Sequence, residues 1–229
     1  MRLSIDRFLK ILLSTFFIQT SWSFFSMQGM GFLFNLIIGT SKEKKNQIMR
    51  THRGFFNTHP YMASYIIGAT IRAYDEQTPP EEIKKFVAVA QTSFASAGDL
   101  LFWQTIRPAL LLIAVVLGIH YGIIGPLVFL VIYNILHLYH RAQGILDGYA
   151  MGWNVIYVLK ARRFKMAQQI FEISGALFCG FLSALISFRV GYLLAIPLTI
   201  LFTVMLLRRH PALLLLFIVL LIIIVFAVV

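Results

Sequence analysis

The stretch Gly98-Asp99-Leu100-Leu101-Phe102-Trp103-Gln104-Thr105-Ile106-Arg107-Pro108 stands directly before the apolar run 109–118. It places an acid, a tryptophan, an arginine and a proline at the entrance to a segment that can enter a bilayer. Ionisable groups are costly in a membrane and usually mark a site there. Arg107 precedes a proline and is therefore biased away from helical dihedral angles. The stretch predicts a helix that is interrupted twice, with a functional site at the interruption.

The composition of the chain predicts an integral membrane protein. Hydrophobic residues make up 59% and charged residues only 13% of the sequence, against about 45–50% and about 25% in soluble proteins. We expect an all-α, polytopic protein with broken or re-entrant helices in residues 1–108 and transmembrane helices in residues 109–229. The expected transmembrane helices lie at about residues 109–119, 122–140, 166–188, 191–207 and 212–229.

The net charge of +11 is distributed in short basic bursts between apolar segments. The bursts at residues 42–53, 160–165 and 208–209 are typical of cytoplasmic loops that face anionic lipid. A nucleic-acid-binding protein needs a continuous basic face, which this pattern does not provide, so we expect no nucleic-acid partner. The same orientation rule predicts that the C-terminus lies on the outer side of the membrane, opposite the cytoplasm.

The N-terminal part of the chain predicts an irregular helical region. Residues 1–20 begin like a signal peptide but show no cleavage site, so an amphipathic helix along the membrane surface fits better. Asn57 or Thr58 is predicted to cap a helix over residues 61–74. The sequence Thr78-Pro-Pro-Glu81 has the spacing of a capping box for a second helix.

The usual signatures of catalysis are missing from the sequence. It contains no phosphate-binding glycine loop, no paired-cysteine metal site and no Gly-x-Ser-x-Gly nucleophile elbow. His137 and His140 have a metal-like spacing without a third ligand nearby, so we interpret them as residues at the membrane–water boundary. His59 is interpreted as a first-turn helix residue rather than a phosphorylated nucleophile. We expect no catalysis by this chain alone, no metal and no cofactor.

Three blocks of residues carry a family resemblance. They are Gln19-x-Ser21-Trp22 with Met27-Gln28-x-x-Gly31-Phe32; His52 with Phe55-Phe56-Asn57-Thr58-x-Pro60; and Gly98-Asp99-x-x-Phe102-Trp103-x-Thr105-x-Arg107-Pro108. With Gly144, Gly148 and Gly152 they extend over roughly residues 15–155. In these blocks the chain resembles a shortened, divergent IID membrane component of the mannose/fructose/sorbose-type PEP-dependent phosphotransferase system.

The resemblance implies a sugar permease subunit in the bacterial cytoplasmic (inner) membrane. Family members pair with a IIC membrane protein to form the sugar pathway, and soluble IIA and IIB proteins relay phosphate to the sugar. The resemblance implies an obligate IIC partner, a hexose-type substrate, a trimer of IIC–IID pairs, and no phosphohistidine on this chain. Its surroundings would be the lipid bilayer.

The motif blocks also nominate site residues. Sugars are bound by amides and carboxylates that exchange hydrogen bonds with hydroxyl groups, and aromatic faces can stack against the sugar ring. The candidates for substrate binding or translocation are Asn57, Thr58, Asp99, Trp103 and Arg107. Gln28, Asn134 and Glu172 are expected to be structural polar groups or to contact a partner, and for the last two a direct substrate contact stays open.

The chain also departs from the family pattern. Residues 92–96 replace a usual Gly-Pro-Leu-Ala-Gly, residues 23–26 replace a usual Asn-Phe-Glu-Arg, and Gly54 stands where a glutamate is common. Two alternatives therefore stay open. The first is a non-transporting regulator or scaffold derived from the same family, and the second is a stand-alone secondary transporter.

Overall fold

The computed structural model describes residues 3–190 and also 197, 200–201, 204 and 219. Within these residues every regular element is a helix, which confirms the all-α class. The elements are α1 (Ile5–Thr15), α2 (Gly29–Gly39), η1 (Lys42–Lys44), α3 (Lys45–His52), α4 (Ala63–Asp75), α5 (Pro80–Gly98), η2 (Asp99–Ile106), α6 (Arg107–Tyr121), α7 (Ile124–Met151), η3 (Gly152–Lys160) and α8 (Arg162–Val190).

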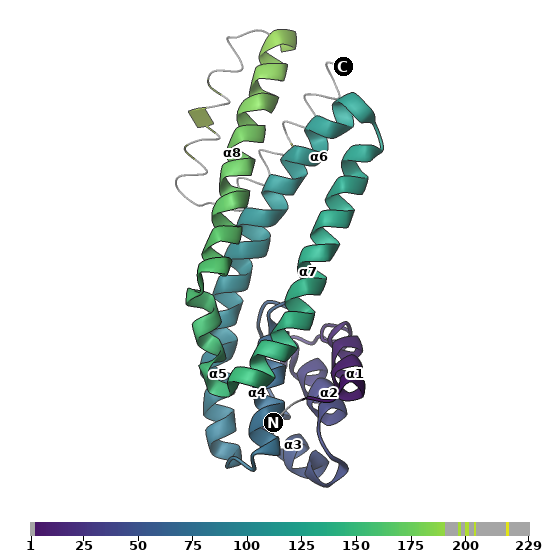
Figure 1. Ribbon diagram of the computed structural model, residues 1–229, viewed down its shortest axis with the longest axis vertical. Coiled ribbons are helices and arrows are strands. Elements are labelled where there is room, and N and C mark those ends of the chain that lie inside the picture. Colours follow the sequence, from purple (N-terminus) through teal and green to yellow (C-terminus); the bar gives the residue numbers. More distant parts are fainter. Residues whose placement is uncertain (1–2, 191–196, 198–199, 202–203, 205–218, 220–229) are drawn as a thin grey trace. The chain divides into compact units, whose positions relative to one another are not determined.

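The chain divides into two compact units that do not follow its linear order. Unit 1 contains Met1–Asp99 and Ile135–Ala161, and unit 2 contains Leu100–Asn134 and Arg162–Val229. This grouping differs from the expected division at residue 108, because the second half of α7 packs with the N-terminal helices. Figure 1 shows the short helices α1 to α4 gathered together and α6 running beside α8.

The expected amphipathic N-terminal helix is present as α1. Ser4 caps it, since its hydroxyl oxygen accepts a hydrogen bond from the backbone N–H of Arg7. Ile11 is fully buried in unit 1, whereas Leu9 and Leu13 are exposed. The Arg7 guanidinium forms two hydrogen bonds with the Asp75 carboxylate, at 2.6 and 2.9 Å, and thereby ties α1 to the end of α4.

Both predicted side-chain caps in this region are wrong. Helix α4 begins at Ala63, and neither Asn57 nor Thr58 caps it. These residues are instead held by partners far away in the sequence, as described below. Helix α5 begins at Pro80 after the N-cap residue Pro79, so the Thr78–Glu81 capping box is not formed. Proline fits the first turn of a helix because the N–H it lacks has no helical partner there.

The interruption predicted around Asp99 is a π-helical segment, η2, between α5 and α6. The hydroxyl of Thr105 donates to the carbonyl of Leu100 at 2.8 Å, which satisfies an acceptor within the widened turns. The second predicted break, at Arg107, is absent because Arg107 is helical and Pro108 lies in the first turn of α6. π-Helical turns of this kind are frequent at functional sites.

Two helical stretches are long and apolar enough to cross a membrane, Pro80–Tyr121 and Ile124–Leu185. Three expected transmembrane segments, 109–119, 122–140 and 166–188, fall on α6, α7 and α8. The expected segments 191–207 and 212–229 lie almost entirely outside the described residues.

Candidate functional site: a junction of the three motif blocks

The first and second blocks are joined by Gln28. Its side-chain amide donates to the carbonyl of Thr58 at 2.8 Å, and its side-chain oxygen accepts from the backbone N–H of Thr58 at 3.3 Å. The backbone N–H of Gln28 also donates to the carbonyl of Phe56 at 2.8 Å. Gln28 is only 3% exposed, so these bonds form in a region that excludes water. Gln28 therefore holds the second block to the first through buried hydrogen bonds.

A second glutamine, Gln91 on α5, holds the same loop from the other side. Its side-chain oxygen accepts from the backbone N–H of Asn57 at 3.0 Å, and its carbonyl accepts from the hydroxyl of Thr58 at 3.0 Å. The sequence reasoning missed Gln91. The available signal was that it is the only amide side chain in the otherwise apolar or small-residue stretch 86–98.

The third block contacts the second at Gly98. A Cβ atom added at Gly98 would lie 2.3 Å from the Cβ of His59, closer than real Cβ contacts allow. Only glycine therefore lets the end of α5 approach the loop this closely. Gln28, the loop 56–60, Gln91 and Gly98 form what we call the motif junction, in which the three blocks meet.

A buried cluster of histidine, tyrosine and arginine side chains lies next to the junction within unit 1. Tyr61 stacks on His137 with ring centroids 4.7 Å apart, and the Arg141 guanidinium lies 5.3 Å from the Tyr61 ring. The hydroxyl of Tyr65 and Nδ1 of His140 form a hydrogen bond at 3.1 Å. His140 and Arg141 are buried within unit 1, where α7 packs against α4, and the interpretation of His140 as a residue at the membrane–water boundary stays a prediction.

His59 belongs to the junction and is not a first-turn helix residue, since α4 begins four residues later, at Ala63. It is 2% exposed. Burial, together with the positive charges of His140 and Arg141, lowers its pKa to about 3. A histidine that exchanges phosphate with a soluble carrier must be reachable from water, so His59 is unsuited to that role.

The buried histidines predict acid sensitivity. Burial, with a contribution from Lys84, lowers the pKa of His52 to about 4, so His52 and His59 are neutral in the folded state. Below pH 6.5 the unfolded chain binds protons that the folded chain does not. Each histidine should therefore cost about 1 kcal/mol of stability per pH unit as the pH falls from 6.5 toward 4. Unfolding midpoints measured across this range should fall, and His52→Phe should reduce the slope. Gln47→Leu, which changes an exposed residue of α3 that does not titrate, should leave the slope unchanged. Equal slopes in all three proteins would contradict the assignment.

The structure places the predicted site residues in different surroundings. The side chains of Asn57 and Asp99 have no hydrogen-bond or ion-pair partner among the described residues, whereas the Thr58 hydroxyl is already bonded to Gln91. Asn57 is exposed and Asp99 is half-buried at the end of α5. Trp103 is 51% exposed, and Arg107 is exposed at the start of α6. Asp99 ends unit 1, while Trp103 and Arg107 belong to unit 2, so a shared site remains a prediction.

Asn134 and Glu172 are both exposed within the second apolar helical stretch, Ile124–Leu185. Asn134 donates to the carbonyl of Leu130 at 2.7 Å in its own helix, and Glu172 accepts from Gln168 at 2.8 Å in α8. Their expected contact with another helix or with substrate stays a prediction.

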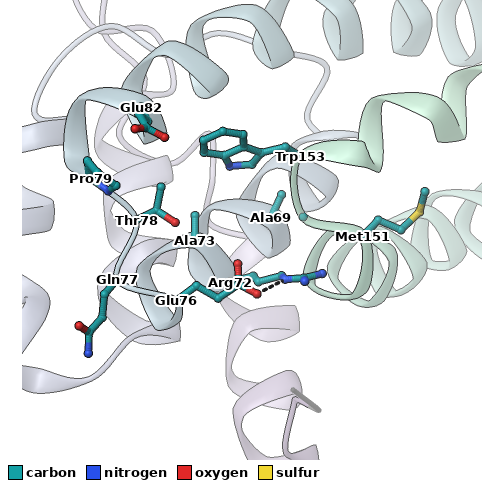
Figure 2. Close-up of a pocket in the computed structure, with 11 residues that line it drawn as sticks. Ala69, Arg72, Ala73, Glu76, Gln77, Thr78, Pro79, Glu82, Met151 and Trp153 are labelled. Atoms are coloured by element: carbon teal, nitrogen blue, oxygen red, sulfur yellow. Dashed lines mark hydrogen bonds and ion pairs between the residues drawn. The ribbon is translucent and has the colours of Figure 1, made fainter.

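Unit 1 also contains a pocket of about 430 Å³ between α4 and η3, which the sequence reasoning missed (Figure 2). Trp153 forms one wall and stacks on Phe86 at 6.0 Å between ring centroids. Arg72 donates to the Glu76 carboxylate at 2.7 Å, as the dashed line in Figure 2 marks. Glu82 also lines the pocket, which therefore contains the carboxylates of Glu76 and Glu82 and the guanidinium of Arg72. We call it the mixed-charge pocket.

A sequence model of the family described as "PTS system mannose/fructose/sorbose family IID component" matches residues 2–224. The chain belongs to this IID family. The resemblance seen in the three motif blocks is thereby confirmed, and these blocks are the ones that meet in the junction.

Curated IID relatives come from several bacteria. The chain is 29% identical to the mannose-specific EIID component of Escherichia coli (strain K12) over 149 residues, covering 60% of this chain and 53% of that protein. It is 28% identical to the fructose permease IID component of Bacillus subtilis (strain 168) over 174 residues, covering 72% and 63%. The chain thus spans between about half and two thirds of the length of these relatives.

Solved structures show the same fold. A cryo-EM structure of the mannose transporter ManYZ in complex with microcin E492 contains a chain that matches with a TM-score of 0.61 and 25% identity, covering 80% of this chain and 70% of that one. A structure described as a membrane protein matches with a TM-score of 0.67 and 26% identity, covering 80% and 71%. The match to a membrane transporter and the two long apolar helical stretches confirm the membrane class.

Proposed function

We propose that this IID chain is the membrane subunit that forms, together with a IIC protein, the sugar pathway of a mannose-family phosphotransferase permease. In this proposal IIA and IIB deliver the phosphate that is transferred to the sugar. One observation carries it: the three blocks that define the family resemblance are joined in a single junction by Gln28, Gln91 and the contact of Gly98 with His59. The junction fixes the loop that carries Asn57 beside the end of α5 that carries Asp99.

The proposed partner is a IIC subunit, in a trimer of IIC–IID pairs. Glu172 is an exposed carboxylate in the apolar helical stretch Ile124–Leu185, where contact with lipid is costly for an ionisable group. A neighbouring membrane protein would cover it. The solved ManYZ complex supports a membrane partner for the family. The proposed location is the bacterial cytoplasmic membrane, crossed several times, with the C-terminus outside.

Within the proposed pathway, Asn57 and Asp99 contact a hexose-type sugar. Each has a hydrogen-bonding side chain without a partner among the described residues, and the backbone of each is fixed: Asn57 by Gln91, and Asp99 by bonds to the carbonyls of Ala95 and Ser96. Trp103 is proposed to stack on the sugar ring, and Arg107 to contact the substrate. Thr58 is assigned a positioning role, since its hydroxyl is occupied.

A second candidate, a regulator or scaffold that does not transport, is favoured by one observation. The departure at residues 92–96 lies in an uninterrupted part of α5, where the hydroxyls of Thr92 and Ser93 bond to the carbonyl of Val89. A Gly-Pro pair, usual in the family at this place, would interrupt the helix. This candidate predicts a stable complex with IIC and no sugar uptake.

Asp99→Asn and Asn57→Ala should reduce sugar uptake while leaving the IIC complex assembled. Each lost contact to a bound sugar is expected to cost about 1–3 kcal/mol, or about fivefold to 150-fold in uptake at limiting sugar. Uptake of radiolabelled hexoses and blue-native gels on the same membranes, with IIC, IIB and IIA co-expressed, measure both effects.

The matched control is Thr58→Val, which removes a hydroxyl that only holds the loop. It should lower the amount of complex and lower uptake in proportion. Loss of complex in step with uptake for Asp99→Asn and Asn57→Ala would make them structural as well. An intact wild-type complex that takes up no hexose would overturn the permease proposal in favour of the regulator.

A further inference from the structure

A second pocket in unit 1, of about 380 Å³, lies between the end of α3 and the first half of α5. Three cationic residues line it: Arg50, Arg53 and Lys84. We call it the basic pocket. Phe32, His52, Phe55, Phe56 and Gln91 also line it.

The basic pocket has no counter-charge of its own. Its lining contains no carboxylate, and none of the three cations forms an ion pair with any residue in the described part of the chain. The mixed-charge pocket differs, because its Arg72 is paired with Glu76. Like charges held around one cavity repel one another and attract an anion into it. Its charge therefore points to an anionic ligand.

The floor of the basic pocket is aromatic and uncharged. Phe32 and Phe56 stack with ring centroids 3.9 Å apart, and His52 meets Phe32 edge to face at 5.6 Å. Phe55 is 59% exposed beside them. A ligand that fits this lining has an anionic group for the rim and an apolar part for the floor.

The position of the pocket along α5 favours a lipid over a soluble acid. Helix α5 begins with charged residues at 81, 82, 84 and 85 and continues with the apolar run 86–90. The pocket is lined from Lys84 to Gln91, where this change occurs. In a membrane protein such a change marks the level of the lipid headgroups, and basic pockets there bind anionic headgroups.

We propose that the basic pocket binds the phosphate group of an anionic membrane phospholipid, with Arg50, Arg53 and Lys84 around the phosphate and the aromatic floor against the apolar part. The pocket shares Phe56 and Gln91 with the motif junction, so a bound lipid braces the loop that carries Asn57. The proposal does not depend on sugar transport.

The test uses the full chain in nanodiscs of phosphatidylcholine with a minor fraction of phosphatidylglycerol. Native mass spectrometry after transfer to detergent measures the phosphatidylglycerol that stays bound. The triple variant R50Q/R53Q/K84Q should lose about tenfold or more of it. The matched variant K42Q/K45Q/K85Q removes the same charge outside the pocket and should retain it. The charge-preserving R50K/R53K/K84R, which tests for misfolding, should also retain most of it.

Four results would overturn the proposal. Equal losses in both Gln triples would mean a diffuse attraction of the basic surface to anionic lipid. Unchanged binding in R50Q/R53Q/K84Q would place the lipid elsewhere. Displacement of the lipid by millimolar inorganic phosphate would assign the pocket to a free anion. Loss of a co-purified acidic protein, with lipid unchanged, would make the pocket a protein contact.

Discussion

Replacing Gly148 with leucine should prevent unit 1 from folding. A Cβ at Gly148 would lie 2.3 Å from the carbonyl oxygen of Tyr65 and 2.9 Å from the backbone N of Ala69, both on α4. Gly68 and Gly144 approach the facing helix in the same way. The obstructing atoms include backbone atoms, so they cannot swing aside, and α4 and α7 would have to separate.

The expected cost of Gly148→Leu is about 4 kcal/mol or more, which belongs to the exceptional end of single substitutions. The measurement is the yield of monodisperse protein and its unfolding midpoint in detergent. Gly118→Ala is the matched control, because a Cβ there meets no atom within 4 Å. That variant should be neutral or gain up to about 1 kcal/mol from better helix propensity. A well-folded Gly148→Leu protein would show that the close approach of α4 and α7 is not required.

The second large effect is expected for Gln28→Leu. Leucine fills a similar volume but leaves the backbone N–H and carbonyl of the buried Thr58 without the partners that Gln28 supplies. An unsatisfied buried group costs about 1–3 kcal/mol, so the two together cost about 2–6 kcal/mol. Gln28→Glu should also destabilise, since it removes the donor to the Thr58 carbonyl and buries a charge.

Two measurements check this expectation. The unfolding midpoint should fall, and amide hydrogen exchange at Thr58 should become faster because its N–H loses an acceptor. Gln47→Leu, on the exposed side of α3, is the matched control and should change stability by no more than about 0.5 kcal/mol. Slow exchange at Thr58 in Gln28→Leu would mean that the loop is held without the glutamine.

Local sequence signals predicted the helical class and the position of the interruption well. These signals are the apolar content, the spacing of the basic bursts and the small-residue stretch before Asp99. Each can be interpreted from neighbouring residues alone, without knowledge of any contact between distant parts of the chain. The family could also be predicted from the sequence, because the three blocks that carry the resemblance are short and specific. The π-helical form of η2, in which Leu101, Phe102, Thr105 and Ile106 are buried, was not predicted.

The sequence by itself therefore determined that this is an all-helical membrane protein of the IID family. The tertiary structure decided what the motif residues do. Thr58 has the local chemistry of a helix cap, yet Gln28 and Gln91, 30 and 33 residues away, take its polar groups instead. The basic pocket likewise gathers Arg50, Arg53 and Lys84 only because α3 packs against α5. Hydrogen bonds and charge clusters of this kind join residues that are distant in the chain, and only the packed fold brings them within reach.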